Sequence, residues 1–228
     1  MNDQGGARPE LFILGAAGHA REVAEVVRAG IAAQGAAAGW IVRGLLDDDP
    51  PLRGSEVGGH RVLCSLDHPD LDHALVALGV GYPETKQKML TRVEGRQVDW
   101  PVLVHPSATL GPRVDMSEGS FIQAGVVLTT EVEIGRYVTL NIGATLSHDV
   151  QVEDLATVSP GAHVGGAVRI GQGAFIGIGA SVIQGIQIGA WSVVGAGAVV
   201  IEDVEPNTVV AGVPARVINR RPEGWQHG

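Results

Sequence analysis

The sequence predicts two domains of different class, a small α/β domain followed by a parallel β-helix. Two observations lead to this prediction. Short apolar runs alternate with amphipathic segments up to Trp100-Pro101, and an unbroken six-residue period begins shortly afterwards. We therefore expect an α/β domain over residues 1–100 and a β-helix domain over residues 101–228.

The α/β domain is expected from three apolar runs with the length and composition of buried strands. These runs are residues 10–15, 40–46 and 74–79. A helix is expected after the first run, because Val23, Val26 and Val27 recur at helical spacing, and a second helix is expected over residues 86–93. Strands that alternate with helices favour a mainly parallel sheet.

The second domain is expected from the six-residue period. From residue 104 to residue 200, every sixth residue is aliphatic or Met. These residues are Val104, Leu110, Met116, Ile122, Leu128, Ile134, Leu140, Leu146, Val152, Val158, Val164, Ile170, Ile176, Val182, Ile188, Val194 and Val200. A small or β-branched residue follows four places later, as at Ala108, Val114 and Ser120, and glycine often follows the aliphatic residue directly.

This period excludes the commoner folds. An α-helix needs a period of 3.6 residues, and each glycine within it would cost about 1 kcal/mol relative to alanine. A β-sandwich needs longer strands with variable turns. A short strand and a tight turn in every six residues fit a β-helix, in which one aliphatic side chain per hexad enters a central column and glycine permits the turns.

The hexads resemble those of the hexapeptide-repeat acyltransferases. This resemblance implies a left-handed parallel β-helix with three hexads per coil, so that residues 104–205 would form between five and six coils. The tail from Val209 to Arg216 is similar to the segment that closes such domains beside coenzyme A. Arg216 is expected either to meet a coenzyme phosphate or to lie on the surface.

The N-terminal half narrows the resemblance. Residues 14–20, LGAAGHA, and the later Leu46-Asp47-Asp48 are similar to the small Rossmann-like domain of the nucleotide-sugar and sialic-acid acetyltransferases. The resemblance implies metal-free acetyl transfer from acetyl-CoA to the 4-amino group of a UDP- or GDP-linked 4-amino-4,6-dideoxysugar. It also implies a homotrimer that serves polysaccharide biosynthesis. The expected cytoplasmic location comes instead from the lack of a recognisable leader or membrane-spanning run. Two alternatives stay open: O-acetylation of sialic acid or another sugar hydroxyl, and a non-catalytic nucleotide-binding scaffold.

His148 and Asp149 are the candidate catalytic pair. They occupy variable positions of the hexad that begins at Leu146, so the repeat does not require them. Attack of an amine on a thioester needs a proton acceptor, and histidine suits this role because its ordinary pKa, about 6.5, lies near neutral pH. A neighbouring carboxylate fixes the tautomer of the imidazole. The resemblance places the base at His148 and its orienting acid at Asp149, and a solvated His-Asp turn is the alternative.

The other histidines have plainer interpretations. His163 is the competing base, but it has no acidic neighbour in the sequence. His105 and His19 each lie beside an expected turn, where an imidazole can hydrogen-bond the backbone. We therefore expect structural roles for these side chains, except where the resemblance assigns His19 to the substrate.

The remaining site residues come from the resemblance. For acetyl-CoA they are Thr157, Gly166, Ile178 and Ala196, of which the last three are expected on successive coils on the same side. Thr157 stands where many family members carry a second histidine. For the nucleotide sugar they are Ala17, Gly18, His19, Asp47, Asp48 and Leu78. Amides at a helix N-terminus suit a phosphate, and Asp47 and Asp48 would accept hydrogen bonds from base or ribose unless they form a solvated turn.

Composition and charge exclude several classes of protein. The formal net charge is -9, and no basic stripe is interleaved with aromatic residues, so we expect no nucleic-acid partner. We expect no leader in MNDQGGARPE and no membrane insertion, because no run of about 18 uninterrupted apolar residues occurs. The single cysteine, Cys64, excludes an internal disulfide, and the scattered histidines favour no metal site.

Overall fold

The computed structural model describes residues 9–34 and 40–227, which divide into two compact units. Unit 1 contains the described residues up to Val80 together with Val93–Pro101, and unit 2 contains Gly81–Arg92 together with the chain from Val102 onwards. The expectation of no leader in MNDQGGARPE concerns mostly residues 1–8, which lie outside the described residues. The division differs in one segment from the boundary expected at residue 100, because residues 81–92 belong to unit 2.

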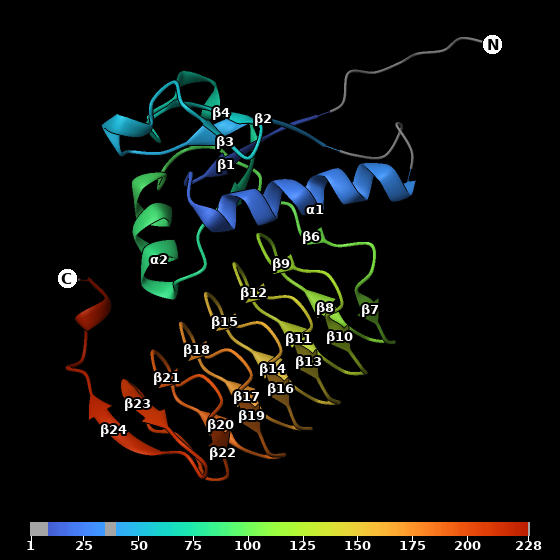
Figure 1. Ribbon diagram of the computed structural model, residues 1–228, viewed down its shortest axis with the longest axis vertical. Coiled ribbons are helices and arrows are strands. Elements are labelled where there is room, and N and C mark those ends of the chain that lie inside the picture. The colour runs from blue at the N-terminus through green and yellow to red at the C-terminus, as the bar shows by residue number, and fades with distance from the viewer. Residues whose placement is uncertain (1–8, 35–39, 228) are drawn as a thin grey trace. The chain divides into compact units, whose positions relative to one another are not determined.

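Unit 1 is a mainly parallel sheet with one long helix against it (Figure 1). Its strands are β1 (Glu10–Leu14), β2 (Ile41–Leu46), β3 (Glu56–Val57), β4 (His60–Cys64) and β5 (Leu75–Leu78), in the spatial order β3-β4-β2-β1-β5. The helix is α1 (Gly18–Gln34), and the short 3-10 helices are η1 (Pro50–Leu52) and η2 (Pro69–Leu71). β1 pairs in parallel with β2 and β5, and only the short β3 is antiparallel to its neighbour among the described strands of this sheet.

The hydrophobic pattern explains these elements. Leu11 and Ile13 of β1 are completely buried, and Val23 and Val27 lie one helical turn apart on the buried face of α1. The predicted apolar runs thus become β1, β2 and β5, and the parallel arrangement is confirmed. The β3–β4 hairpin was not expected, because its strands lack an apolar run of strand length.

Unit 2 contains a regular stack of two-residue strands between residues 103 and 200 (Figure 1). These strands are β6 (Leu103–Val104), β7 (Thr109–Leu110), β8 (Asp115–Met116), β9 (Phe121–Ile122), β10 (Val127–Leu128), β11 (Glu133–Ile134), β12 (Thr139–Leu140), β13 (Thr145–Leu146), β14 (Gln151–Val152), β15 (Thr157–Val158), β16 (His163–Val164), β17 (Arg169–Ile170), β18 (Phe175–Ile176), β19 (Ser181–Val182), β20 (Gln187–Ile188), β21 (Val193–Val194) and β22 (Val199–Val200). Every strand ends at one of the aliphatic residues or Met that define the sequence period.

Each strand pairs in parallel with the third strand along the chain, as β12 does with β9 and β15. The pairs build three ladders, which run from β6 to β21, from β7 to β22 and from β8 to β20. One coil therefore contains three hexads, and the stretch from β6 to β22 makes between five and six coils, as predicted. The parallel β-helix is confirmed.

The core of unit 2 is a single aliphatic column. The second residue of each strand from Ile122 to Val200 is buried, as are the small residues four places later, such as Val126, Ala144 and Val150. Burial of one aliphatic side chain contributes about 1.5–3 kcal/mol. The β-helix is therefore stabilised by the burial of many small aliphatic side chains rather than of a few large ones.

Helix α2 (Pro83–Arg92) and the C-terminal segment complete unit 2. Strand β23 (Thr208–Ala211) extends the first ladder in parallel, and β24 (Arg216–Arg220) pairs antiparallel with β23. The short η3 (Trp225–His227) contacts α2. The antiparallel β24 was not expected, since its residues are all exposed and it carries no buried pattern.

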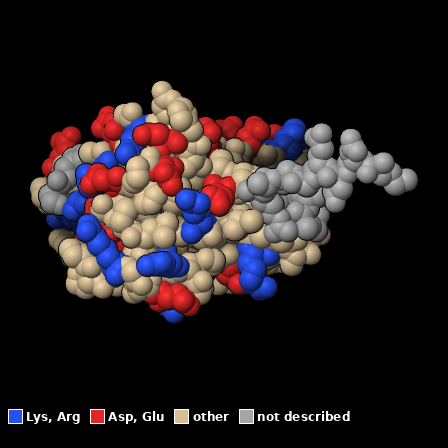
Figure 2. All heavy atoms as spheres, turned by 90° about the horizontal axis from the view of Figure 1, so that it is seen from above, with Lys and Arg blue, Asp and Glu red and all other residues tan. Residues whose placement is uncertain are grey.

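Charged side chains of both signs are exposed on the surface. On the face shown in Figure 2, Lys and Arg side chains are interspersed with Asp and Glu side chains. No helix of the described ranges is both long enough and apolar enough to cross a bilayer.

Candidate active site

The turn after β13 carries the candidate catalytic pair. Leu146 and Val150 anchor the turn, because both side chains are completely buried in the column. The Asp149 amide donates to the Thr130 carbonyl at 3.1 Å, one coil earlier. On the other side, the Ala167 amide donates to the His148 carbonyl at 2.8 Å. The backbone of the pair is therefore held by both neighbouring coils.

His148 and Asp149 form a hydrogen-bonded dyad. The Nδ1 atom of His148 lies 2.7 Å from Oδ2 of Asp149, and the side chains are 62% and 59% exposed. Consecutive residues of a strand point to opposite faces, but Asp149 has a φ of 59°, in the left-handed region, which turns its side chain toward His148. With the Nδ1 proton held by the carboxylate, Nε2 can accept a proton from a reacting group.

Gly166 lies one coil after His148 and forms a support for its ring. A Cβ atom on Gly166 would lie 2.5 Å from both Cε1 and Nε2 of His148, closer than real contacts allow. The glycine therefore leaves the space that the imidazole occupies. We name the column of turns that contains Thr130, His148 and Gly166 the dyad corner.

Ile178 and Ala196 lie on a different corner from Gly166. Their turns follow β18 and β21, in the ladder that runs from β6 to β21, whereas the turn of Gly166 follows β16 in another ladder. The Gly197 amide donates to the Ile178 carbonyl at 2.8 Å, which joins the two turns of this second corner. The expectation that Gly166, Ile178 and Ala196 share one side of the β-helix is wrong. The six-residue period determines which residues lie at corners. Two residues share a corner only if they are separated by one or more full coils of eighteen residues.

Thr157 does not present its hydroxyl to solvent. The side chain is 2% exposed, and Oγ1 donates to the carbonyl of Gly81 at 2.7 Å within unit 2. The sequence could not indicate this contact, because Gly81 lies 76 residues earlier in the chain. This hydroxyl was expected to contact acetyl-CoA, but it donates its hydrogen bond to a backbone carbonyl instead.

The other histidines make local contacts. Nδ1 of His163 lies 2.8 Å from Oγ1 of Thr145, the equivalent residue one coil earlier. His105 accepts a hydrogen bond from the Ser107 amide at 3.0 Å, which is the backbone role expected for it. Among the described residues, only His148 pairs with a carboxylate within the β-helix.

The candidate nucleotide-sugar residues gather at one edge of the sheet in unit 1. Ala17 and Gly18 follow β1, Asp47 and Asp48 follow β2, and Leu78 ends β5, so all five lie at the carboxyl ends of neighbouring parallel strands. Ligands of open α/β sheets bind outside these ends. His19 stands in the first turn of α1, where Nδ1 lies 2.8 Å from Oε2 of Glu22.

The two aspartates shape the loops at this edge. Asp47 accepts hydrogen bonds from the Ala16 amide at 2.8 Å and from the Asp49 amide at 2.9 Å. Oδ1 of Asp48 accepts from the Leu66 amide at 3.1 Å. Asp47 therefore links the loop after β1 to the loop after β2, a role that sequence reasoning did not assign to it.

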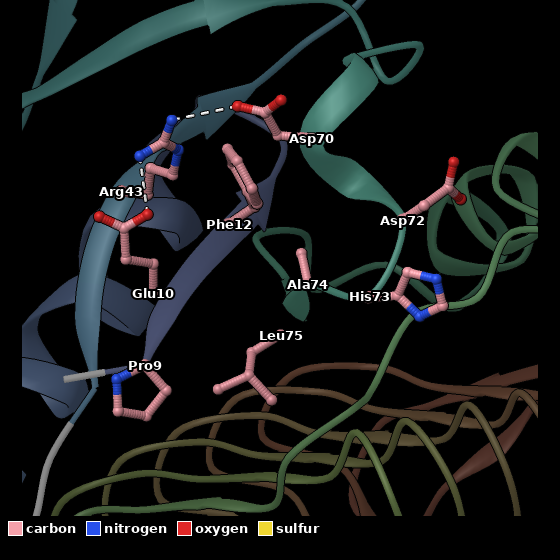
Figure 3. A pocket seen from close by; sticks show the side chains of 9 residues that line it. All are labelled: Pro9, Glu10, Phe12, Arg43, Asp70, Asp72, His73, Ala74 and Leu75. Atoms are coloured by element: carbon pink, nitrogen blue, oxygen red, sulfur yellow. Dashed lines mark hydrogen bonds and ion pairs between the residues drawn. The ribbon is translucent and has the colours of Figure 1, made fainter. Parts of the chain in front are cut away.

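A pocket of about 420 Å³ lies at the opposite end of the same sheet (Figure 3). It is lined by Pro9, Glu10, Phe12, Arg43, Asp70, Asp72, His73, Ala74 and Leu75. Arg43 donates to Glu10 at 2.7 Å and to Asp70 at 3.1 Å, so its charge is already paired. None of the candidate substrate residues lines this pocket.

Arg216 and Lys86 are basic residues of unit 2 in opposite environments. Arg216, exposed in β24, donates to its neighbour's carbonyl and lies 3.9 Å from Glu202, so its side chain is on the surface. Lys86 of α2 is completely buried, and burial lowers its pKa well below that of an exposed lysine. The complete burial of Lys86 was not predicted from the sequence. In the described part of the chain, no three His, Cys, Asp or Glu side chains gather as a metal site.

Comparison with known proteins shows which families and solved structures the chain resembles. Residues 167–202 match the family model described as bacterial transferase hexapeptide (six repeats). No curated protein sequence matches the chain. Among solved structures, PerB from Caulobacter crescentus in complex with CoA and GDP-perosamine is 29% identical, with a TM-score of 0.83, over 93% of this chain and 99% of that chain.

Two more structures are similar over more than nine tenths of this chain. The acetyltransferase domain of PglB from Neisseria gonorrhoeae FA1090, in complex with acetyl coenzyme A, is 28% identical, with a TM-score of 0.79, over 93% of this chain and 100% of that chain. WeeI from Acinetobacter baumannii AYE is 28% identical, with a TM-score of 0.78, over 91% of this chain and 99% of that chain. The hexads, the match over residues 167–202 and these structures show that the chain has the left-handed β-helix with an N-terminal α/β unit that is found in PerB, PglB and WeeI.

Proposed function

We propose that this protein is an acetyl-CoA-dependent N-acetyltransferase that acts on the 4-amino group of a nucleotide-linked amino-deoxysugar. The observation that carries the proposal is the exposed His148–Asp149 dyad, with a 2.7 Å hydrogen bond, on a β-helix like that of a protein solved with CoA and GDP-perosamine. A scaffold would have no need of an oriented base on its surface.

The proposed reaction is direct transfer without a covalent enzyme intermediate. The neutral sugar amine attacks the thioester carbonyl, a C–N bond forms, and Nε2 of His148 takes the proton that the nitrogen loses. Asp149 holds the Nδ1 proton and stabilises the imidazolium. When the C–S bond breaks, the imidazolium returns its proton and coenzyme A leaves as the thiol.

The tetrahedral intermediate needs donors for its oxyanion. Gly166 is proposed for this role through its backbone amide, because its turn adjoins the imidazole and the residue carries no side chain of its own. A preorganised donor at such a position contributes about 10²–10³ in rate. Gly166 would thus have two roles in the reaction: it leaves space for the imidazole of His148, and its amide stabilises the negative charge of the oxyanion.

The nucleotide sugar is proposed to bind at the carboxyl edge of the sheet in unit 1. The loop between β1 and α1 leads into the N-terminus of a 17-residue helix, where amides and the helix dipole favour a diphosphate. Ala17, Gly18 and His19 would meet this group, Asp47 and Asp48 the base or ribose, and Leu78 an apolar part of the nucleotide.

A homotrimer belongs to the proposal. Gly166 lies at the dyad corner, whereas Ile178 and Ala196 lie at the second corner, so one chain does not bring all the proposed acetyl-CoA residues together. A closed ring of three chains can place the second corner of one chain beside the dyad corner of the next. Light scattering of the purified protein would test this, and a monomer at assay concentration would contradict it.

Acetyl-CoA, a thiol reagent and a panel of nucleotide-linked sugars test the reaction directly. The proposal expects release of the coenzyme A thiol with UDP- or GDP-linked 4-amino-deoxysugars, in a cytoplasmic step of polysaccharide biosynthesis. Release only with hydroxyl sugars such as sialic acid would favour O-acetylation, for which the same base would serve. Release with neither class would favour a non-catalytic nucleotide-binding protein.

A further inference from the structure

The dyad corner changes in character beyond Gly166. In the two turns up to that point, the residue directly after the buried aliphatic position is Ser147 and then Gly165. In the next two turns the same position holds Ile183 and Ile201, whose side chains are 38% and 40% exposed. Single exposed aliphatic side chains are common on protein surfaces, but these two lie one coil apart on the same corner as the proposed base.

Backbone hydrogen bonds keep these turns in register. The Gly185 amide donates to the Gly166 carbonyl at 2.9 Å, and the Ile183 amide donates to a carbonyl of the next coil at 3.1 Å. Gln184 therefore occupies the position of Gly166 in the next coil, about 4.8 Å further along the corner. Its side chain is exposed, and no described residue hydrogen-bonds its carboxamide. We name Ile183, Gln184 and Ile201 the corner strip.

The corner strip is the surface next to the reactive nitrogen of the proposed base. The imidazole of His148 extends along the corner to Gly166, where a Cβ atom would lie 2.5 Å from Nε2. Asp149 binds the other ring nitrogen, Nδ1, at 2.7 Å. A group that gives its proton to Nε2 therefore lies near Gly166, and the coil that follows Gly166 carries the corner strip.

The corner strip has the chemistry of a site for the pantetheine arm of an acyl carrier. This arm consists of short methylene chains joined by amide groups. Ile183 and Ile201 provide apolar surface for the methylene groups, and the carboxamide of Gln184 offers both a donor and an acceptor to an amide. The three side chains carry no charge, so the strip does not favour a phosphate.

The length of the arm agrees with the spacing of the coils. In acetyl-CoA an ethylene group joins the thioester sulfur to the first amide nitrogen, so an extended arm places that nitrogen about 5 Å from the carbonyl carbon. This distance is close to the spacing of neighbouring coils. A carbonyl carbon held beside Gly166 therefore brings the first amide of the arm to Gln184.

We propose that the corner strip binds the arm of the acetyl carrier. Gln184 hydrogen-bonds the amide nearest the thioester, and Ile183 and Ile201 pack on the methylene groups. The inference rests on the proposed function, since it takes the carbonyl carbon to lie between Nε2 of His148 and the amide of Gly166. Gln184 is then a binding residue for acetyl-CoA on the same chain as the base.

Thioesters that share only part of the arm test this contact. Acetyl-pantetheine keeps the arm without the nucleotide, and S-butyl thioacetate lacks the amides. Gln184→Ala should raise KM about threefold to tenfold for acetyl-CoA and for acetyl-pantetheine, because one hydrogen bond to the arm is lost. The value of kcat should change by less than about twofold. The rate with S-butyl thioacetate should be the same as in wild type.

Gln172→Ala is the matched control. Gln172 is also an exposed glutamine in the second place after a buried aliphatic residue, but its turn follows β17 at a different corner. Its replacement should leave both KM values at those of wild type. An unchanged KM in Gln184→Ala would overturn the inference. So would a rise in KM for acetyl-CoA that is absent for acetyl-pantetheine, because the contact would then be with the nucleotide part.

Ile201→Ser tests the apolar part of the corner strip. The affinity for CoA, measured by calorimetric titration, should fall about threefold to tenfold, because apolar surface for the arm is lost. The mass of the protein in light scattering should stay that of wild type. A changed mass with unchanged CoA affinity would show that a second copy of the chain covers the strip, and this would overturn the inference.

Binding of CoA separates this inference from the proposed function, because it needs no sugar. Wild type and Gln172→Ala should bind CoA more tightly than Gln184→Ala does, whether or not any sugar is acetylated. Equal affinities in the three proteins would refute the role of Gln184 even if acetyl transfer is found. Failure of the wild type to bind CoA would overturn the inference and the proposed function together.

Discussion

The imidazole of His148 lies against the backbone of Gly166, so that a Cβ atom on Gly166 would stand 2.5 Å from Nε2. Two residues one coil apart thus share the space in which the proposed reaction takes place. The exposed imidazole can rotate away from an added methyl group, so the fold would tolerate a side chain at Gly166, whereas the position of the base would not.

Gly166→Ala should therefore impair catalysis more than stability. We expect kcat to fall about tenfold to a hundredfold, because a displacement of the base of about 1 Å is costly in rate. A double-mutant cycle with His148→Ala checks the cause. If the methyl group acts by displacing the ring, Gly166→Ala should have little further effect in the His148→Ala background. Full additivity would show that Gly166 acts independently of the base.

Asp149→Asn tests the acid of the dyad. Asparagine tolerates the left-handed backbone of this position, so the free energy of unfolding should change by less than about 0.5 kcal/mol. The rate should fall at least about tenfold, because an amide does not hold the Nδ1 proton or support the imidazolium as a carboxylate does.

Glu131→Gln is the matched control for Asp149→Asn. Glu131 is the equivalent residue one coil earlier, it has a φ of 55°, and its carboxylate pairs with Arg113. Its replacement should change kcat by less than about twofold. Equal rate losses in the two variants would indicate that the general negative charge of this corner matters, rather than the orientation of His148.

The hexad pattern shows how far sequence alone reaches. Each aliphatic position or Met ends a strand, and from Ile122 onwards all of these residues are buried. Leu110 is 40% exposed, because it lies in the first coil, where the ladder of β7 has a neighbour on one side only. The hexad pattern therefore predicts which side chains are buried, except in the first coil of the β-helix.

The contacts that define the candidate site were harder to predict. The dyad depends on the left-handed conformation of Asp149, and the turn sequence does not specify this because Asp is also common with negative φ. The support of His148 by Gly166 depends on the number of residues per coil. The hydrogen bond of Thr157 depends on Gly81, which lies in a segment with no hexads.

Lys86 predicts an unusual dependence of stability on pH. In the folded protein burial lowers the pKa of Lys86, whereas in the unfolded chain the pKa is that of a free lysine, about 10.4. Below the lowered pKa both states bind the proton, and desolvation of the charge is at its most costly. Between the two pKa values only the unfolded chain keeps the proton, so the contribution of Lys86 to stability rises with pH.

Denaturant unfolding of wild type and Lys86→Met from pH 7 to pH 10 measures this contribution. The difference in free energy of unfolding, wild type minus variant, should increase with pH. Lys88 is an exposed lysine of the same helix, so the same difference for the control variant Lys88→Met should not change with pH. The Nζ atom of Lys86 donates hydrogen bonds to the carbonyl oxygens of Tyr137, Leu155 and Ala156. A difference that falls with pH would show that these carbonyls raise the pKa of Lys86 in the folded protein by more than burial lowers it.

Asp47→Ala tests the substrate edge of unit 1. The change removes the acceptor for the Ala16 and Asp49 amides, so the loop after β1 should lose its fixed conformation. We expect a loss of stability of about 1–2 kcal/mol and weaker binding of the preferred nucleotide, with CoA binding unchanged. Calorimetric titration and thermal unfolding provide the two measurements. Nucleotide binding at the wild-type level would place the site elsewhere.

The central claim is that His148 catalyses acetyl transfer from acetyl-CoA to a sugar amine. The most direct test incubates wild type and His148→Ala with acetyl-CoA and nucleotide-linked 4-amino-deoxysugars such as GDP-perosamine, and follows both thiol release and the mass of the sugar product. The account predicts one acetyl group per amine with wild type and a rate about 10²–10⁴ lower with His148→Ala, in a variant that keeps its fold. Acetylation at an undiminished rate by His148→Ala, or no acetylated amine with wild type, would contradict it.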